Sequence, residues 1–177
     1  AGDPWAIIEV LIGAECEADD SGNPNGSDKS RWWAAAYQDV FSDSFVESVQ
    51  AELVLEAQRQ RAMPGYFFLG QPGKGLENRV IQGLRKIGGG RLKSYLLGEQ
   101  NPRDLLEFDN MDELSPDSNS THGYEVAILL TDSTTYGFFG RSQDGGGYRG
   151  FHTADWTIVG AMVDMLHRTY RLQVGVG

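Results

Sequence analysis

Apolar residues recur at intervals of three and four between residues 31 and 61, and this spacing predicts a long amphipathic helix. The apolar stripe contains Trp33, Tyr37, Val40, Phe41, Phe45, Val49, Leu53 and Ala57. A continuous helix over this segment would be about 45 Å long at a rise of about 1.5 Å per residue. We therefore expect a break near residues 42–44, where serine and aspartate side chains compete for backbone hydrogen bonds.

Short apolar runs bounded by glycine, proline and asparagine predict strands. These runs are residues 5–12, 66–69, 92–97, 124–130, 136–139 and 148–153. The last three are joined by connections too short for a crossover, so they predict an antiparallel three-strand meander. Residues 15–29, between the first run and the long helix, read as a polar loop.

Two further helical patterns complete the expected fold. Residues 76–87 form an amphipathic pattern ended by three glycines, and a last helix begins after a cap at Thr153 or Asp155. Residues 98–123 are polar, with one helical turn expected near Leu105. The pattern thus predicts one α+β domain over residues 1–177, with a mixed or antiparallel sheet that ends in the meander and is packed by helices. Residues 1–61 are expected to form a strand and a long N-terminal helical segment, and residues 62–177 the sheet-containing core.

Chain length and cysteine content favour an intracellular globular domain. The 177 residues suit one domain, and a single cysteine, Cys16, excludes an intrachain disulfide. The longest apolar run, residues 5–13, contains Glu9 and is too short for a membrane helix. We expect a cytoplasmic protein without membrane contact. Because the chain begins with Ala1 rather than Met, we also expect a fragment of a longer protein whose output module lies outside it.

The net charge of −10 is unevenly distributed along the chain. Residues 1–60 carry −9, residues 61–95 carry +6 and residues 96–177 carry −7. Nucleic acid is excluded as the main partner, since its binding depends on neutralising phosphates with basic residues. We call residues 61–95 the basic island. It predicts either a small anionic ligand or internal neutralisation by the acidic N-terminal segment, and the second interpretation needs no ligand.

The loop at 70–75, Gly-Gln-Pro-Gly-Lys-Gly, lies between an expected strand and an expected helix. A helix N-terminus can bind phosphate, and Lys74 and Arg79 would supply positive charge. The Walker pattern fails, however, because Phe68 replaces its first glycine and Gly75 replaces the serine or threonine that holds magnesium. An ordinary strand-to-helix turn is the alternative, and the failed pattern favours it.

A second group of candidate ligand-binding residues lies in the meander. Tyr136 and Phe138 alternate with glycines that leave room for a small molecule, and Arg149 and His152 follow on the next strand. His152 and Asp155 come closest to an acid–base pair, but no nucleophile has a recognisable setting. The alternative roles are a helix cap for Asp155 and strand packing for His152. The three histidines and Cys16 do not form a metal-ligand pattern, and the sequence identifies no cofactor.

The segment from Tyr124 to Tyr170 resembles a known family of sensory domains. It contains Gly-Phe-Phe-Gly in one strand and Tyr-Arg-Gly-Phe-His-Thr-Ala-Asp-Trp-Thr-Ile-Val leading into a helix. This pattern is similar to the C-terminal half of bacterial DICT domains, which are found in diguanylate cyclases and two-component systems. The resemblance implies an α/β domain that binds a signal and relays it to an attached module, without catalytic residues of its own.

The leading hypothesis is therefore a non-enzymatic sensory or regulatory domain of a bacterial signalling protein, which relays a packing change through the 31–61 helix. One alternative is a protein–protein adaptor that forms a homodimer through the same helix. Trp32 and Trp33 cannot both face one core, so one of them is a candidate interface anchor. Another alternative is an enzyme acting on a phosphorylated small molecule, with Lys74 and Arg79 binding phosphate and His152 with Asp155 transferring protons.

Overall fold

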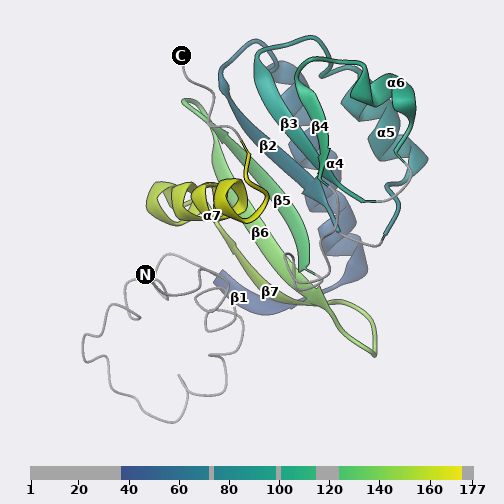
Figure 1. The fold of residues 1–177 in the computed structure, drawn as a ribbon. Coiled ribbons are helices and arrows are strands. Elements are labelled where there is room, and N and C mark those ends of the chain that lie inside the picture. The colour runs from purple at the N-terminus through teal and green to yellow at the C-terminus, as the bar shows by residue number, and fades with distance from the viewer. Residues whose placement is uncertain (1–36, 72–73, 99–100, 115–123, 173–177) are drawn as a thin grey trace.

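The described residues form a seven-stranded mixed sheet with helices on both faces (Figure 1). The computed structural model describes residues 37–71, 74–98, 101–114 and 124–172. The strands are β1 (Tyr37–Phe41), β2 (Gly65–Gly70), β3 (Leu92–Leu97), β4 (Met111–Leu114), β5 (Tyr124–Thr131), β6 (Thr135–Ser142) and β7 (Tyr148–Thr153). The helices are α4 (Asp43–Arg59), α5 (Asn78–Arg85), α6 (Arg103–Leu106) and α7 (Trp156–Thr169). The predictions for residues 5–12, for residues 15–29 and for Cys16, Trp32 and Trp33 lie outside this part.

The order of strands across the sheet is β1-β7-β6-β5-β2-β3-β4. β5, β6 and β7 are consecutive antiparallel neighbours, which confirms the predicted meander. β2 pairs antiparallel with β5 on one side and parallel with β3 on the other, and β3 pairs parallel with β4. The α+β class and the mixed sheet are therefore as predicted. Because β2 and β5 are antiparallel neighbours, the C-terminal end of β2 lies beside the N-terminal end of β5.

The predicted helix over residues 31–61 is wrong at residues 37–41, which form β1 and pair antiparallel with β7. Phe41 is 6% exposed and packs on Phe138, whereas Val40 is 54% exposed. Both residues fitted the helical spacing, but the free edge of β7 offers these residues a ladder of hydrogen bonds. The expected break is present, because Ser42 caps α4 by accepting a hydrogen bond from the Phe45 amide at 3.1 Å.

The sheet separates two apolar cores, because successive strand residues point to opposite faces. α7 covers one face and packs on residues that include Phe68, Phe139 and Phe151. α4 and α5 cover the other face, where Phe67, Leu129 and Phe138 lie (Figure 1). β1 and α4 thus belong to the sheet and its core instead of extending from it.

β4 is a second element that the sequence did not predict. It lies in the polar segment at 98–123, where only the helical turn near Leu105 was expected and is found as α6. Only the ends of β4, Met111 and Leu114, are buried, so four residues carry too little pattern to reveal a strand. β4 pairs parallel with β3 and is the outermost strand on this side of the sheet.

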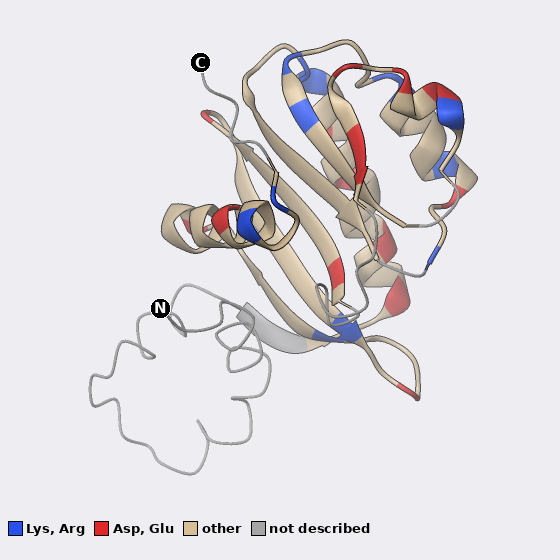
Figure 2. Ribbon diagram, viewed as in Figure 1, with Lys and Arg blue, Asp and Glu red and all other residues tan. Residues whose placement is uncertain are grey.

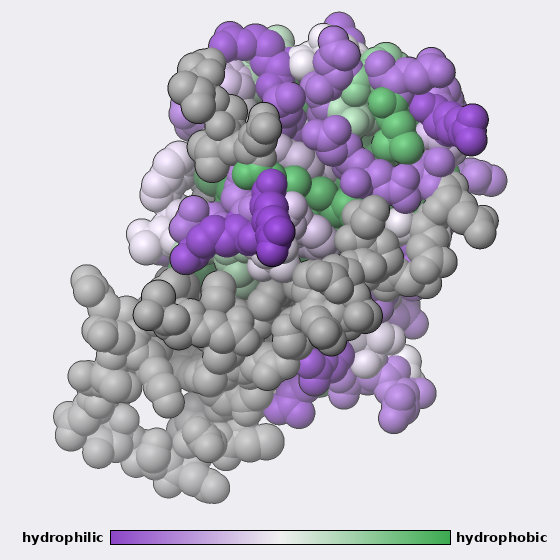
Figure 3. Space-filling view, in the orientation of Figure 1, coloured by the Kyte–Doolittle hydropathy of each residue, from purple (hydrophilic) through white to green (hydrophobic). Residues whose placement is uncertain are grey.

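Acidic residues follow α4, and basic residues lie mostly on and around β3 and α5 (Figure 2). On the face seen in Figure 3, apolar residues in the coloured part appear in small, separated areas among hydrophilic ones. Within the described ranges, every helix is too short or too polar to cross a membrane.

Candidate functional site

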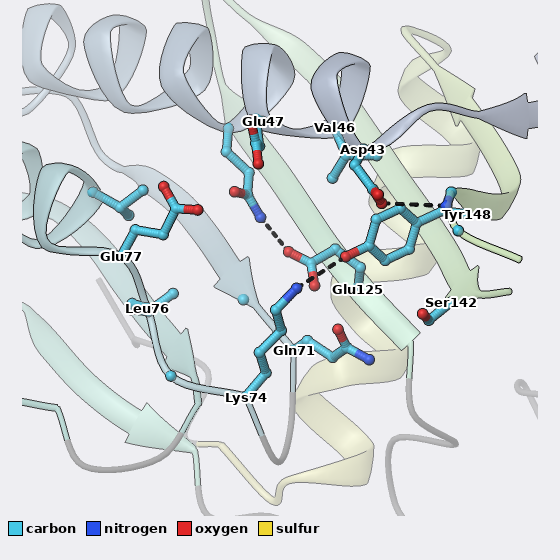
Figure 4. Close-up of a pocket in the computed structure, with 16 residues that line it drawn as sticks. Asp43, Val46, Glu47, Gln71, Lys74, Leu76, Glu77, Glu125, Ser142 and Tyr148 are labelled. Carbon is cyan, nitrogen blue, oxygen red and sulfur yellow. Dashed lines mark hydrogen bonds between the residues drawn. The ribbon is translucent and has the colours of Figure 1, made fainter. Parts of the chain in front are cut away.

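A cleft of about 380 Å³ opens at one end of the central strands, where β2 ends and β5 begins (Figure 4). Its walls are the first half of α4, the loop that joins β2 to α5, and the hairpin that joins β6 to β7. The polar side chains that line it are Asp43, Glu47, Gln50, Gln71, Lys74, Glu77, Glu125, Ser142 and Tyr148. Four separate parts of the chain therefore contribute to one site, which we call the Glu125 cleft.

Gly70 allows the chain to turn away from the sheet beneath this cleft. Its φ of 123° is a backbone conformation that residues with side chains rarely adopt. A Cβ atom at this position would lie 1.8 Å from the carbonyl oxygen of Leu97 on β3. A glycine is therefore required where β2 ends, and the loop that follows brings Lys74 over the cleft.

Glu125 forms the floor of the cleft and is only 4% exposed. It precedes Ala127 and Leu129 on the α4 face of β5, so strand alternation directs its side chain toward α4. Gln50 of α4 donates a hydrogen bond to Oε1, while Oε2 is buried and has no hydrogen-bond partner among the residues that the structure describes. Burial raises the pKa of Glu125 to about 7, although the charge of Lys74 and the bond from Gln50 act in the opposite direction.

Lys74 reaches across the cleft to the β6–β7 hairpin. Its Nζ donates a hydrogen bond to the hydroxyl oxygen of Tyr148 at 3.2 Å. This bond raises the pKa of Lys74, so the ammonium group remains charged at neutral pH. The hairpin is also joined to α4, because Asp43 Oδ1 accepts a hydrogen bond from the amide of Gly147 at 3.3 Å. Side chains on three elements thus meet around Glu125.

The carboxylates of the cleft do not form a metal centre. In the part of the chain that the structure describes, no three His, Cys, Asp or Glu side chains converge to hold a metal ion. Figure 4 shows Glu47 and Glu77 on one side of Glu125 and Asp43 on the other. The arrangement can therefore bind hydrogen-bond donors and positive charge at several separate points.

The structure separates the six residues that the sequence nominated for ligand binding. Lys74 lines the Glu125 cleft, on the strand–loop–helix unit that the sequence predicted. Arg79 lines a different hollow of about 350 Å³ between α4 and α5, together with Leu55, Gln58 and Lys86. We call this hollow the α4–α5 groove. Lys74 and Arg79 therefore do not meet around one phosphate group.

The other four nominated residues lie along the meander. Tyr136 and His152 share a hydrogen bond of 3.2 Å, and burial raises the pKa of Tyr136 and lowers that of His152. Phe138 is completely buried against Phe41, so it belongs to the core and lines neither the cleft nor the groove. Arg149 lies on the opposite face of β7 from His152, because their positions differ by three.

The proposed acid–base pair of His152 and Asp155 is not assembled near the cleft. Asp155 caps α7 by accepting a hydrogen bond from the Ile158 amide at 3.0 Å, as the alternative interpretation predicted. His152 contacts the rings of Phe41 and Phe45. It lies four residues along β7 from Tyr148, or about 13 Å at about 3.3 Å per residue. His152 is not among the residues that line the Glu125 cleft, so the structure does not place it beside Lys74.

The sequence did not identify Glu125, Gln50 and Tyr148 as site residues. Glu125 did leave a signal, because it is the only charged residue in the apolar run at 124–130. A lone carboxylate in a strand expected to be buried requires a partner or a role. Gln50 and Tyr148 left no such signal, since their contacts with Glu125 and Lys74 depend on how the elements pack.

In comparisons with known proteins, no family model, no curated protein and no solved structure matches this chain. The resemblance to DICT domains therefore stays a prediction.

Proposed function

We propose that this chain is a non-enzymatic sensory or regulatory domain that binds a small polar molecule in the Glu125 cleft. The observation that carries the proposal is the buried Glu125 carboxylate, whose Oε2 has no hydrogen-bond partner in the described part of the chain. A buried polar atom without a hydrogen bond costs roughly 1–3 kcal/mol, so a sequence selected only for stability would replace it. A buried titratable group that lies in a cleft and has a shifted pKa is a candidate for a functional site.

The packing of α4 suggests how binding would be relayed. Asp43, Glu47 and Gln50 on its first half line the cleft, and Leu55 and Gln58 on its second half line the α4–α5 groove. A ligand that shifts the first half would therefore move a surface near the other end of the helix. The proposal agrees with the sensory role that the resemblance to DICT domains implies, with α4 in place of the longer predicted helix.

The test is a thermal-shift screen of the whole chain against a panel of small polar metabolites, followed by calorimetry of each hit. We expect at least one compound to raise the melting temperature saturably. Glu125→Gln should lose the response, whereas Glu107→Gln, an exposed carboxylate far from the cleft, should keep it. Equal responses in the two variants, or none in the unmodified chain, would contradict the proposal.

An adaptor function is the second candidate, and the α4–α5 groove favours it. Leu55 is 45% exposed there, beside the basic side chains Arg79 and Lys86. The simplest version is self-association through this surface, in place of the predicted homodimer along residues 31–61. Sedimentation equilibrium should then show a dimer that Leu55→Glu dissociates. A monomer at all concentrations would remove this version.

A further inference from the structure

The charge of the Glu125 cleft narrows the choice of ligand. Among the described residues that line it, the carboxylates are Asp43, Glu47, Glu77 and Glu125, and the cation is Lys74. The carboxylates come from α4, from the start of α5 and from β5. Fields of this sign concentrate cations and repel anions, most strongly in a hollow that excludes water.

The unpartnered oxygen of Glu125 specifies the complementary chemical group. Gln50 already donates to Oε1, so in the ionised carboxylate Oε2, which no described residue contacts by a hydrogen bond, can accept one from an N–H or O–H group of a ligand. A charged donor makes a hydrogen bond roughly twice as strong as a neutral one. A primary ammonium group supplies both the donor and the positive charge, and it is small enough to approach a buried atom.

The separation of the carboxylates indicates more than one cationic group. Glu47 comes from α4 and Glu77 from the start of α5, and both lie on the same side of Glu125 in Figure 4. No single metal ion is held by three such groups in the described residues, but an organic chain can place nitrogens several bonds apart. Resting on the function proposed above, we propose that the ligand is a small organic cation with two or more amino groups. One amino group contacts Glu125, and another contacts Glu47 and Glu77.

An anionic ligand, which is one of the two interpretations of the basic island, fits the same cleft less well. A phosphate would bind at the N-terminus of α5, next to Lys74. Glu77 is the N-cap residue of α5 and lines the cleft, so its carboxylate lies where the phosphate would approach. Lys74 also donates to the Tyr148 hydroxyl, and an anion would have to compete for that donor.

The experiment compares 1,4-diaminobutane, n-butylamine and inorganic phosphate as probes, by calorimetry and thermal shift at low salt and about pH 8, where Glu125 is mostly ionised. We expect saturable binding of the diamine, and binding of n-butylamine that is at least about ten times weaker. Glu125→Gln should weaken the diamine about 10- to 100-fold, since it removes a charged acceptor. Glu47→Gln, at an exposed position, is a second variant that leaves the core intact, and it should weaken binding several-fold. Glu107→Gln should leave the affinity unchanged.

Lys74→Met decides the sign of the ligand charge. It removes the cation of the cleft, so the diamine should bind as tightly as before or several-fold tighter. Binding of phosphate that is lost in Lys74→Met would overturn the cationic class and leave the binding function intact. The same conclusion follows if the diamine fails while another compound binds in a Glu125-dependent manner. If neither the three probes nor the metabolite panel binds, both proposals are wrong.

Discussion

Glu125 makes the stability of the fold depend on pH. Burial raises its pKa from 4.5 to about 7, so between these values the folded state holds a proton that the unfolded state releases. The free energy of unfolding therefore falls as pH rises through this window, by about 3 kcal/mol in total. Above the folded pKa this carboxylate causes no further change. The charged groups that face Glu125 in the cleft are Lys74 and the carboxylates of Asp43, Glu47 and Glu77.

Urea unfolding of the unmodified chain and of Glu125→Gln, at several values between about pH 5 and pH 8, checks this prediction. The free energy of unfolding of Glu125→Gln should lack this decline. Its stability relative to the unmodified chain should therefore increase as pH rises. His152 acts oppositely in both proteins, because burial lowers its pKa and its contribution is lost as pH falls below its ordinary value. Parallel curves for the two proteins would show that Glu125 is not the group responsible.

Gly70 is a second position where one residue controls the cleft. Alanine there would combine a strained backbone conformation with a Cβ atom 1.8 Å from the Leu97 carbonyl oxygen. We expect Gly70→Ala to destabilise the fold by about 2 kcal/mol or more, measured by urea unfolding. Gly145→Ala is the matched control, because its Cβ would meet nothing within 4 Å. Similar losses in both variants would mean that the β2–α5 loop does not depend on this close approach.

At the scale of elements, β1 is the segment whose role differs most from its sequence pattern. Phe41 is buried against the rings of Phe45 and Phe138, at centroid distances of 4.8 and 5.5 Å, while its neighbour Val40 is mostly exposed. Phe41→Ala should therefore cost about 3–5 kcal/mol of unfolding free energy. Val40→Ala should cost less than about 0.5 kcal/mol, as exposed substitutions do.

This pair of variants separates a strand from a helix at residues 37–41. In the helix predicted from the spacing, Val40 and Phe41 both lie on the apolar stripe, so both substitutions would be costly. Equal losses, measured by urea unfolding under the same conditions, would therefore favour the helix and contradict the pairing of β1 with β7.

At the scale of the whole molecule, α4 connects the Glu125 cleft to the α4–α5 groove, while α7 lies on the opposite face of the sheet. Binding in the cleft should therefore slow amide exchange along all of α4 and leave α7 unchanged. Hydrogen exchange followed by mass spectrometry, with and without saturating 1,4-diaminobutane, measures this. Protection limited to the β2–α5 loop and the β6–β7 hairpin would rule out α4 as the relay.

The sequence by itself determined the elements whose patterns are local and complete. β3 and β7 have the predicted bounds, and α7 follows Asp155, one of the two caps that the sequence predicted. The connections in the meander were short enough to dictate antiparallel pairing, so the order β5-β6-β7 also followed. These features depend on residues close together in the chain, so their periodicity and turns specify them without reference to long-range contacts.

Only the tertiary structure decided the elements and contacts that depend on distant neighbours. Residues 37–41 form a strand because β7 offers them a free edge, and β4 forms because β3 offers another. Neither segment has a sufficient strand pattern of its own. The Glu125 cleft required α4, β5 and two loops to converge, and it separated Lys74 from Arg79, which lie five positions apart in the chain. Sequence spacing constrains which side chains share one element, but the packing of elements determines which ones share a site.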